Sequence, residues 1–372
     1  MRRLKTQPRP DWKKLVESQG LHYHTFDEEL YWDESACYQF EEHEIDALEQ
    51  ATYELDGMCL NAVETVIREG LWDQFRIAPV YRDWIRNSWE IDRHTIVGRF
   101  DFAYDGDGSP KMLEYNADTP TGLLEAAAIQ WYWLQDCCPD MDQFNSIHDR
   151  LVEAWHRFLA ESNGVLYFLS TAGHIEDYMN VNYLRDTAMQ AGARTEYLPM
   201  EELGFDKRTE QFVDANDRAI LSAFKLYPWE WMLDEAFGNH LIYTKMKWLE
   251  PPWKILMSNK AIMAVLWDLY PGNPYLLETS TSPIPGDYVR KPCQSREGQG
   301  VEILVAGSVL QGKHESDSGT VYQRYQPIRK FDGQSPVIGS WMINGYAAGI
   351  GIREDSGLIT GNDSRFIPHF FG

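Results

Sequence analysis

The chain has 372 residues, of which 44% are hydrophobic and 13% aromatic. This length exceeds what one small core can serve, so we expect a globular protein of two or three packed subdomains. The net charge is −23, from 34 basic and 57 acidic residues, and it argues against nucleic acid as a partner because phosphates require a basic surface.

The cysteine content and the first residues of the chain indicate the cellular compartment. The five cysteines are an odd number without C-x-x-C spacing, so the sequence indicates neither a disulfide framework nor a zinc site. Residues 1–10 are basic but precede no apolar core, and the chain contains no run of 18 apolar residues. We therefore expect a cytoplasmic protein with no export signal and no membrane span.

A long amphipathic helix is predicted over residues 43–69. Its apolar residues recur with a period near 3.6, and the pattern stops at Gly70, a residue that often follows a helix C-terminus.

Residues 97–104 and 111–118 read as the two strands of a hairpin around a turn-rich Asp/Gly/Pro segment. We take Tyr104 as the partner of Lys111. With this register, the remaining polar pairs are Asp101 with Glu114 and Arg99 with Asn116.

Two facing carboxylates repel each other unless a cation lies between them. Asp101, Glu114 and the amide of Asn116 offer the hard oxygen ligands that Mg²⁺ prefers, with Arg99 beside them. The alternative is an exposed hairpin whose outer face is merely polar. An EF-hand calcium loop is excluded, because Pro110 occupies the position that requires glycine.

After the hairpin, Thr119 is predicted as the N-cap and Pro120 as the first residue of a helix that continues over residues 123–134. The positive end of this helix would then face an anion at the metal.

Residues 146–161 predict a helix, residues 165–169 a buried strand, and a further helix runs to Gly192. This order implies a parallel βα unit, in which ligands bind at the carboxyl ends of strands. Glu176 and Asp177 would lie there. The alternative is that both acids only favour the first helical turn through the helix dipole.

The last third of the chain is predicted to be largely antiparallel. Short strands separated by turns follow residue 287, and Asn344-Gly345 between two apolar runs is a strong hairpin signal.

Nucleotide binding would need an unusual site, because neither a P-loop motif nor a Gly-x-Gly-x-x-Gly at a helix start occurs. The candidate is a strand ending in Lys291, followed by the glycine-containing loop 295–300. A surface lysine on a glycine-containing hairpin is the alternative. Lys260 opens the apolar helix 261–267, where it opposes the helix dipole, so we expect an anion to hold it. Two lysines, a loop and a metal hairpin are what one ATP site needs.

Several segments together resemble the glutathionylspermidine synthase family, and the match runs over about residues 12–370. They are Arg99-Phe-Asp-Phe, Leu113-Glu-Tyr-Asn-Ala-Asp-Thr-Pro120, Ser258-Asn-Lys-Ala261, Lys291-Pro with Ser295-Arg-Glu-Gly298, and Gly351-Ile-Arg-Glu-Asp355. The resemblance implies an α+β or α/β fold of the ATP-grasp type with permuted order, a pre-ATP-grasp-type parallel βα subdomain and a C-terminal antiparallel sheet. Residues 1–372 would form one synthetase module, divided into 12–135 (metal hairpin and helices), 136–250 (substrate) and 251–372 (ATP).

The resemblance also implies roles for individual residues. Mg²⁺ would be held by Asp101, Glu114 and Asn116. ATP would be bound by Arg99, Lys260, Lys291, Ser295, Arg296, Glu297, Gly298 and Gln323, with Arg99 stabilising the transferring phosphoryl group and Gln323 near the adenine. The polyamine and the amino-acid end of the peptide would be received by Glu176 and Asp177. The acid substrate would be lined by Thr119, Glu230 and Arg353.

Two departures from the family pattern matter. The chain has no room for the N-terminal amidase domain of the bifunctional enzymes, so amide hydrolysis is not expected. Trp231 stands where the characterised synthetases have a small hydroxyl residue, so the acid substrate need not be glutathione.

The sequence thus predicts an ATP- and Mg²⁺-dependent acid–amine ligase that forms an amide through an acyl phosphate. Its substrates would be a glutathione-like peptide or other carboxylic acid and a polyamine or other amine; the oligomeric state stays open. One alternative is an ATP-binding regulator without turnover, although all five ligands and lysines are present. A glycan hydrolase is disfavoured, because it has no use for the two lysines.

Overall fold

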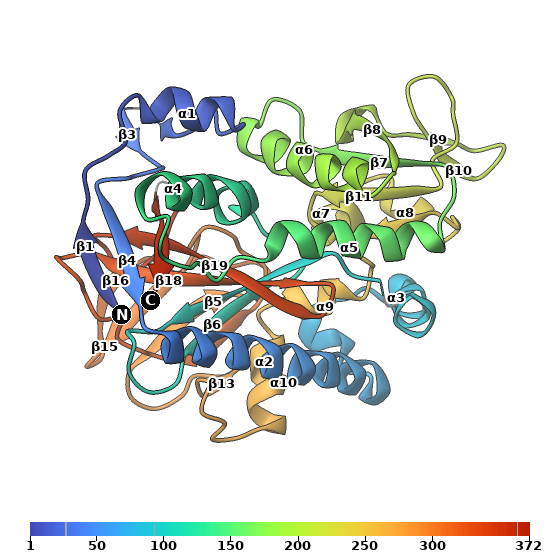
Figure 1. The fold of residues 1–372 in the computed structure, drawn as a ribbon. Coiled ribbons are helices and arrows are strands. Elements are labelled where there is room, and N and C mark those ends of the chain that lie inside the picture. Colours follow the sequence, from blue (N-terminus) through green and yellow to red (C-terminus); the bar gives the residue numbers. More distant parts are fainter. Residues whose placement is uncertain (27, 93, 363) are drawn as a thin grey trace.

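The computed structural model describes residues 1–372 except 27, 93 and 363. At its centre lies an antiparallel sheet that joins the hairpin near residue 100 to the C-terminal strands (Figure 1). In spatial order its strands are β20 (Arg365–Ile367), β19 (Tyr346–Asp355), β18 (Ser335–Ile343), β5 (Val97–Ala103) and β6 (Lys111–Asn116). The hairpin at Asn344-Gly345 is confirmed.

Helix α2 (Glu42–Glu69) covers one face of this sheet and packs against β18 and β19, while α5 (Ile147–Ala160) packs against the same strands from the other side (Figure 1). The predicted helix over 43–69 is confirmed. A capping box between Glu41 and Glu44 begins α2, and Gly70 ends it with φ of 70°, a left-handed conformation that glycine adopts without strain.

A second sheet of four parallel strands confirms the predicted βα unit. Its order is β12 (Lys247–Leu249), β11 (Ser222–Leu226), β7 (Val165–Ser170) and β8 (Arg194–Pro199). Helix α6 (Ile175–Gln190) connects β7 to β8 and packs on both of them.

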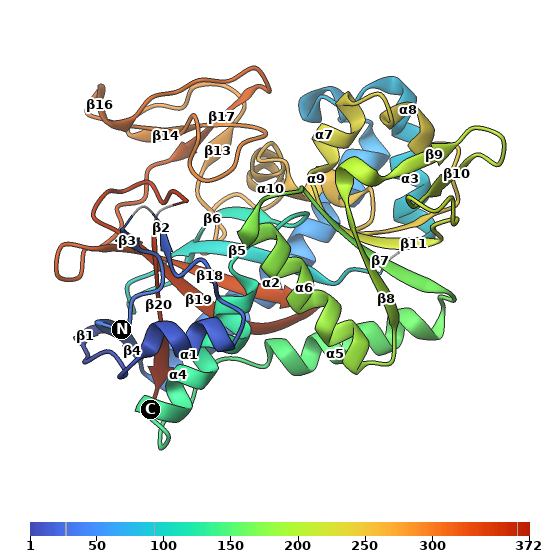
Figure 2. The same ribbon diagram turned by 90° about the horizontal axis from the view of Figure 1, so that it is seen from above.

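A third, antiparallel sheet confirms the predicted character of the C-terminal third. Its order is β13 (Thr279–Ser280), β17 (Thr320–Arg324), β14 (Tyr288–Pro292), β15 (Glu302–Val305) and β16 (Ser308–Gly312). It is reached through α9 (Lys254–Ser258) and α10 (Ile262–Leu269). Figure 2 shows the third sheet and the parallel sheet on opposite sides of the molecule.

The chain ends meet in a small sheet of β1 (Arg2–Lys5), β4 (Ala36–Phe40) and β21 (His369–Phe371), so the termini lie near each other (Figure 1). The remaining elements are α1 (Trp12–Ser18), β2 (Thr25–Phe26), β3 (Glu29–Leu30), the 3₁₀ helix Trp72–Phe75, α3 (Pro79–Ile91), the π-helix Glu125–Ile129, α4 (Gln130–Cys137), the 3₁₀ helix Met200–Glu202, β9 (Gly204–Asp206), β10 (Gln211–Val213), α7 (Trp229–Asp234) and α8 (Gly238–Leu241).

The starting assumption for the hairpin register is wrong, because Lys111 pairs with Ala103 rather than with Tyr104. An irregularity between Asp101 and Phe102 then shifts the ladder by one residue. Beyond it, Asp101 faces Glu114 as predicted, and Arg99 likewise faces Asn116. The bulge therefore restores the predicted pairs at the polar end of the hairpin.

The predicted helix start at Thr119 and Pro120 is also wrong. Residues 119–122 are irregular, and a π-helical turn, Glu125–Ile129, precedes α4. Gly122 has φ of 81°, which is unsuited to a helix. The helix therefore begins farther from Asn116 than predicted.

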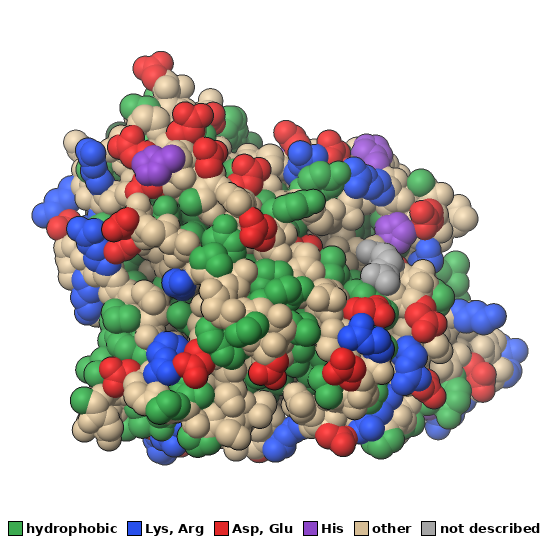
Figure 3. All heavy atoms as spheres, turned by 90° about the horizontal axis from the view of Figure 1, so that it is seen from below, with side chains coloured by type: hydrophobic (Ala, Val, Ile, Leu, Met, Phe, Trp, Pro, Cys, Tyr) green, Lys and Arg blue, Asp and Glu red, His purple; other side chains and the backbone are tan. Residues whose placement is uncertain are grey.

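Within the described part of the chain, every helix is too short or too polar to cross a membrane. On the face seen in Figure 3, acidic and basic side chains are interspersed rather than gathered into a basic surface. The charge distribution on this face thus gives no support for nucleic-acid binding.

Candidate functional site

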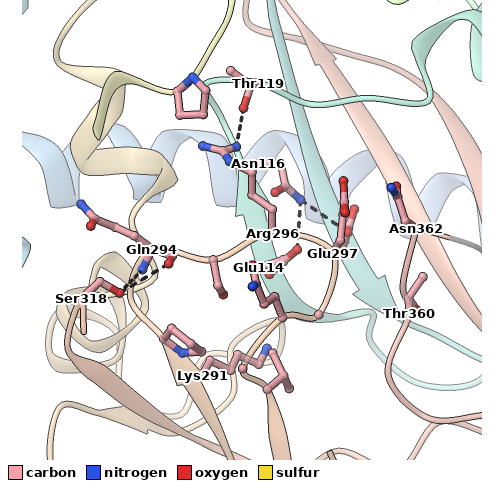
Figure 4. Close-up of a pocket in the computed structure, with 18 of the residues that line it drawn as sticks. Glu114, Asn116, Thr119, Lys291, Gln294, Arg296, Glu297, Ser318, Thr360 and Asn362 are labelled. Carbon is pink, nitrogen blue, oxygen red and sulfur yellow. Dashed lines mark hydrogen bonds between the residues drawn. The ribbon is translucent and has the colours of Figure 1, made fainter. Parts of the chain in front are cut away.

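A cavity of about 1270 Å³ opens where the three sheets meet. Its lining comes from the β5–β6 hairpin, the start of α6, α7, β14 and β17, and the loop 295–300. All of the predicted site residues line it except Lys260, which bonds to two of the lining residues. Figure 4 shows Glu114, Asn116, Lys291 and Arg296 around one hollow.

Asp101 is buried and held by two arginines. The guanidinium of Arg99 donates to both carboxylate oxygens, with Nε 2.6 Å from Oδ1 and Nη2 3.0 Å from Oδ2. Arg353, from β19, donates to Oδ2 over 3.0 Å. Because β19 reaches β5 only through β18, the tertiary fold brings the second arginine to the hairpin.

Glu114 lies across the ladder from Asp101, and the amide nitrogen of Asn116 is 3.2 Å from its Oε1 and 3.4 Å from Asp101 Oδ2. The Nζ atom of Lys260 is 3.2 Å from Glu114 Oε2. The expected anion beside Lys260 is therefore Glu114. Burial by itself would raise the pKa of Glu114. The positive charges of Lys260 and Lys291 together have the larger effect and lower this pKa to about 2.

Lys291 projects from β14 toward the hairpin. Its Nζ donates to the carbonyl oxygen of Leu113 over 2.8 Å and to Gln323 Oε1 over 2.7 Å. Burial lowers the pKa of Lys291 to about 8; the charge of Glu114 opposes this shift and that of Lys260 adds to it. Gln323 is 2% exposed, so lysine and glutamine form the floor of the cavity at this end.

The oxygen donors at the hairpin fit a hard divalent cation. Asp101, Glu114 and Asn116 converge from two paired strands, and carboxylate and amide oxygens are the ligands that Mg²⁺ takes. The amide nitrogen of Asn116 faces both carboxylates, and rotation of the amide would present its oxygen to the same point. Among the described residues no cluster of three His, Cys, Asp or Glu forms a metal site, so the amide is needed to complete this one.

The loop 295–300 closes one side of the cavity. Its first carbonyl, that of Ser295, accepts a hydrogen bond of 2.7 Å from Lys260. Glu297 and Gly298 both have positive φ, 54° and 70°. A Cβ on Gly298 would lie 2.5 Å from Ile359 Cγ2, so glycine is what lets the loop pack on the segment before β20.

Arg296 extends from this loop across the cavity (Figure 4). Its Nη1 donates to Thr119 Oγ1 over 2.6 Å and its Nη2 to Glu230 Oε1 over 2.7 Å. Its guanidinium also lies 5.6 Å from the ring centre of Trp231. The loop, the segment after the hairpin and α7 are thus joined through one side chain, and the predicted residues Thr119 and Glu230 meet there.

Glu176 and Asp177 stand in the first turn of α6, at the carboxyl end of β7, as predicted. Burial raises the pKa of Glu176 to about 7, and the negative charge of Glu125 adds to that shift. Burial also raises the pKa of Asp177. A pure helix-dipole role would favour charge on both acids, whereas here their burial opposes it.

Two buried charged groups near the cavity were missed by the sequence reasoning. Glu125 accepts hydrogen bonds from the hydroxyls of Tyr23 and Tyr31, and Lys225 bonds Asp118 over 2.6 Å. Each stands alone in an apolar run, Leu-Leu-Glu-Ala-Ala-Ala and Ser-Ala-Phe-Lys-Leu. A single charge in such a run is the signal that could have identified them, since buried charges are rarely tolerated without a partner.

Comparison with known proteins places these features in a family. A family model described as "Glutathionylspermidine synthase preATP-grasp" matches residues 3–372. A Haemophilus influenzae protein, provisionally named as an acid–amine ligase, is 40% identical, with the alignment covering 98% of this chain and 97% of that protein.

Two longer proteins are also similar. Trypanothione synthetase from Crithidia fasciculata is 28% identical over 76% of this chain and 48% of its own length. The bifunctional glutathionylspermidine synthetase/amidase of Escherichia coli is 26% identical over 86% and 56%. The chain spans about half the length of these two synthetases. The family match and the full-length relative agree with the resemblance seen in the sequence. The chain therefore belongs to the glutathionylspermidine synthase family.

Proposed function

We propose that the protein is an ATP- and Mg²⁺-dependent ligase that joins a carboxylic acid to an amine. The observation that carries the proposal is the charge arrangement at the hairpin. Two carboxylates and an amide are surrounded by Arg99, Arg353, Lys260 and Lys291 in a cavity that also reaches acids on α6. Four cations against two carboxylates leave a positive excess, which suits a triphosphate.

We assign the residues around the hairpin the following roles in binding ATP and Mg²⁺. Lys260 and Lys291 would bind the phosphates, and the loop of Ser295, Arg296, Glu297 and Gly298 would cover them with backbone N–H groups. Gln323, fixed by Lys291, would lie near the adenine. When bound at Asp101, Glu114 and Asn116, Mg²⁺ would neutralise phosphate charge.

The reaction would proceed in two displacements. A carboxylate oxygen of the acid attacks the γ-phosphorus, the bond to the β-phosphate oxygen breaks, and ADP leaves. The amine nitrogen then attacks the acyl carbon, phosphate departs with the bonding electron pair, and the amine loses a proton. Arg99 would stabilise the phosphoryl group in the first displacement. Thr119, Glu230 and Arg353 would position the acid, and Glu176 and Asp177 the amine.

We further propose the permuted ATP-grasp organisation for this chain. In that scheme residues 251–372 carry the nucleotide, residues 136–250 with the parallel sheet carry substrate, and residues 12–135 supply the metal hairpin. The separation of the third sheet from the parallel sheet supports this division (Figure 2).

The test is release of ADP from Mg-ATP across a panel of carboxylic acids and amines that includes glutathione and spermidine. We expect ADP only when a matching acid is present, and hydroxylamine should trap the acyl phosphate as a hydroxamate. If Mg-ATP binds but no pair yields ADP or hydroxamate, the ligase proposal is wrong and a regulator without turnover takes its place.

A further inference from the structure

Glu125 is a buried carboxylate with one oxygen left over. It is 0% exposed, and its Oε1 accepts hydrogen bonds from Tyr23 over 3.1 Å and Tyr31 over 2.5 Å. Within the described residues, Oε2 has no hydrogen-bond partner. Such an oxygen is costly to bury and calls for an explanation.

Hydrogen bonds of a shared neighbour, Asn180, link the surroundings of Glu125 to Glu176. Asn180 of α6 donates to the hydroxyl of Tyr23 and to the carbonyl oxygen of Glu176, over 3.2 and 3.0 Å. The two carboxylates are close enough for the charge of Glu125 to add to the raised pKa of Glu176. Glu176 lines the cavity, while Glu125 stands behind it on the π-helical turn, a distortion that is frequent at functional sites.

The titratable and charged groups around this pair come from several elements. Those that act on the two carboxylates are Tyr23 and Tyr31 before β4, Arg99 on β5, Asp177 on α6 and Glu297 on the loop 295–300. Arg99 is already bonded to Asp101, and the other four groups are tyrosines or acids. His174 and Arg296 also act on Asp177, but no described lysine or arginine lies within ion-pair distance of Glu125, Glu176 or Asp177. This end of the cavity therefore holds three carboxyl groups without a paired cation.

We infer that Glu125 is a second, buried carboxylate of the amine subsite, and that it makes this end of the cavity select a ligand that arrives as a cation. The inference depends on the proposed function in one respect, because it identifies this cationic ligand as the amine substrate. Without ligand, burial and the charge of Glu125 both favour the protonated form of Glu176. An ammonium group would balance the charge of the two carboxylates and displace that proton.

The experiment measures binding, so it does not depend on turnover. Titration calorimetry with spermidine, putrescine and methylamine is run at pH 6, 7 and 8.5, in two buffers that differ in ionisation enthalpy, to count protons released. Wild-type protein should bind at least one of the three, release protons at pH 7 and bind more tightly as pH rises from 6 to 8.5.

Glu125→Gln keeps the side-chain shape but removes the charge. Its affinity at pH 8.5 should be about tenfold weaker, since one nearby opposite charge is lost. Between pH 6 and 8.5 its affinity should change less than that of wild type, with fewer protons released, because the charge of Glu125 no longer adds to the raised pKa of Glu176. Glu54→Gln, an exposed charge change on α2, should behave as wild type.

Tyr31→Phe serves as a second variant in case Glu125→Gln does not fold. It removes a donor that favours the carboxylate of Glu125, so amine binding should weaken at pH 7 and recover at pH 8.5.

The inference is overturned if none of the three amines binds, or if folded Glu125→Gln matches wild type in affinity at pH 8.5 and in proton release. Loss of ADP formation with every acid, alongside normal amine binding, would instead contradict the proposed ligase activity and leave this subsite standing.

Discussion

The two ends of the cavity have opposite charge balances. At the β5–β6 hairpin, Asp101 and Glu114 are outnumbered by four surrounding cations. At the start of α6, Glu176 and Asp177 stand with Glu125 and form no ion pair with any described lysine or arginine. The pKa values follow this contrast, because that of Glu114 is lowered to about 2 whereas that of Glu176 is raised to about 7.

This difference in charge suggests how one cavity could hold nucleotide, acid and amine in a fixed order. A positive excess suits a polyanion, and carboxyl groups without a paired cation suit a cationic ligand. An acid substrate held between them would meet the phosphates on one side and the amine on the other. The opposite charges would thus keep nucleotide and amine from exchanging places.

The strongest test of the positive end is Arg99→Lys, which keeps the charge but loses the two-oxygen contact with Asp101. We expect the rate of ADP release to fall on the order of 10²-fold or more if Arg99 stabilises developing charge. Arg82→Lys, in an ion pair with Asp73 on the 3₁₀ helix Trp72–Phe75 and outside the cavity lining, is the matched control. A wild-type rate in Arg99→Lys would remove Arg99 from the mechanism.

Lys291→Met tests whether the positive excess binds nucleotide. The loss of one charged hydrogen bond to phosphate should weaken Mg-ATP binding by about ten- to a hundredfold in calorimetry. Lys313→Met, an exposed lysine after β16, should leave the affinity unchanged. Equal affinities in the two variants would show that Lys291 does not contact ATP.

Glu176→Gln tests the negative end through pH. The folded-state pKa of about 7 exceeds the ordinary 4.5, so the folded protein retains a proton that the unfolded chain has lost between these values. Stability is therefore lost as pH rises through this window, by about 1–3 kcal/mol. The variant should be more stable than wild type at pH 8, and this difference should be much smaller at pH 5.

Urea unfolding at both pH values measures this difference, and Glu202→Gln, an exposed acid next to the parallel sheet, is the control. A stability difference between Glu176→Gln and wild type that does not change with pH would mean that Glu176 has an ordinary pKa.

The smallest effect is expected for Arg296→Ala, which removes the connection of the loop 295–300 with the segment after the hairpin and with α7. Its ion pair with Glu230 is partly exposed, so the free energy of unfolding should change by less than about 1 kcal/mol. Amide hydrogen exchange in the loop should nevertheless become faster, because Thr119 and Glu230 no longer hold it. Unchanged exchange, as expected for the exposed control Arg208→Ala, would exclude a closing role.

The sequence anticipated the site where local patterns were enough. Alternation along the hairpin predicted that Asp101 faces Glu114, and strand–loop–helix order predicted acids at the start of α6. It failed at Tyr104, because a one-residue bulge carries no alternation signal of its own. It failed again at Thr119, where the positive φ of Gly122 and the hydrogen bond from Arg296 to Thr119 favour an irregular segment over a helix.

By itself, then, the sequence determined the long helix α2, the parallel βα unit, the antiparallel character of the last third, the polar face of the hairpin and the family, because each depends on periodicity or on short motifs. The tertiary structure alone decided that Arg353 meets Asp101 and that Glu125 stands behind Glu176. These contacts join residues far apart in the chain, and burial then sets their charge states. Neither distance in space nor loss of solvent can be read from the spacing of residues along a chain.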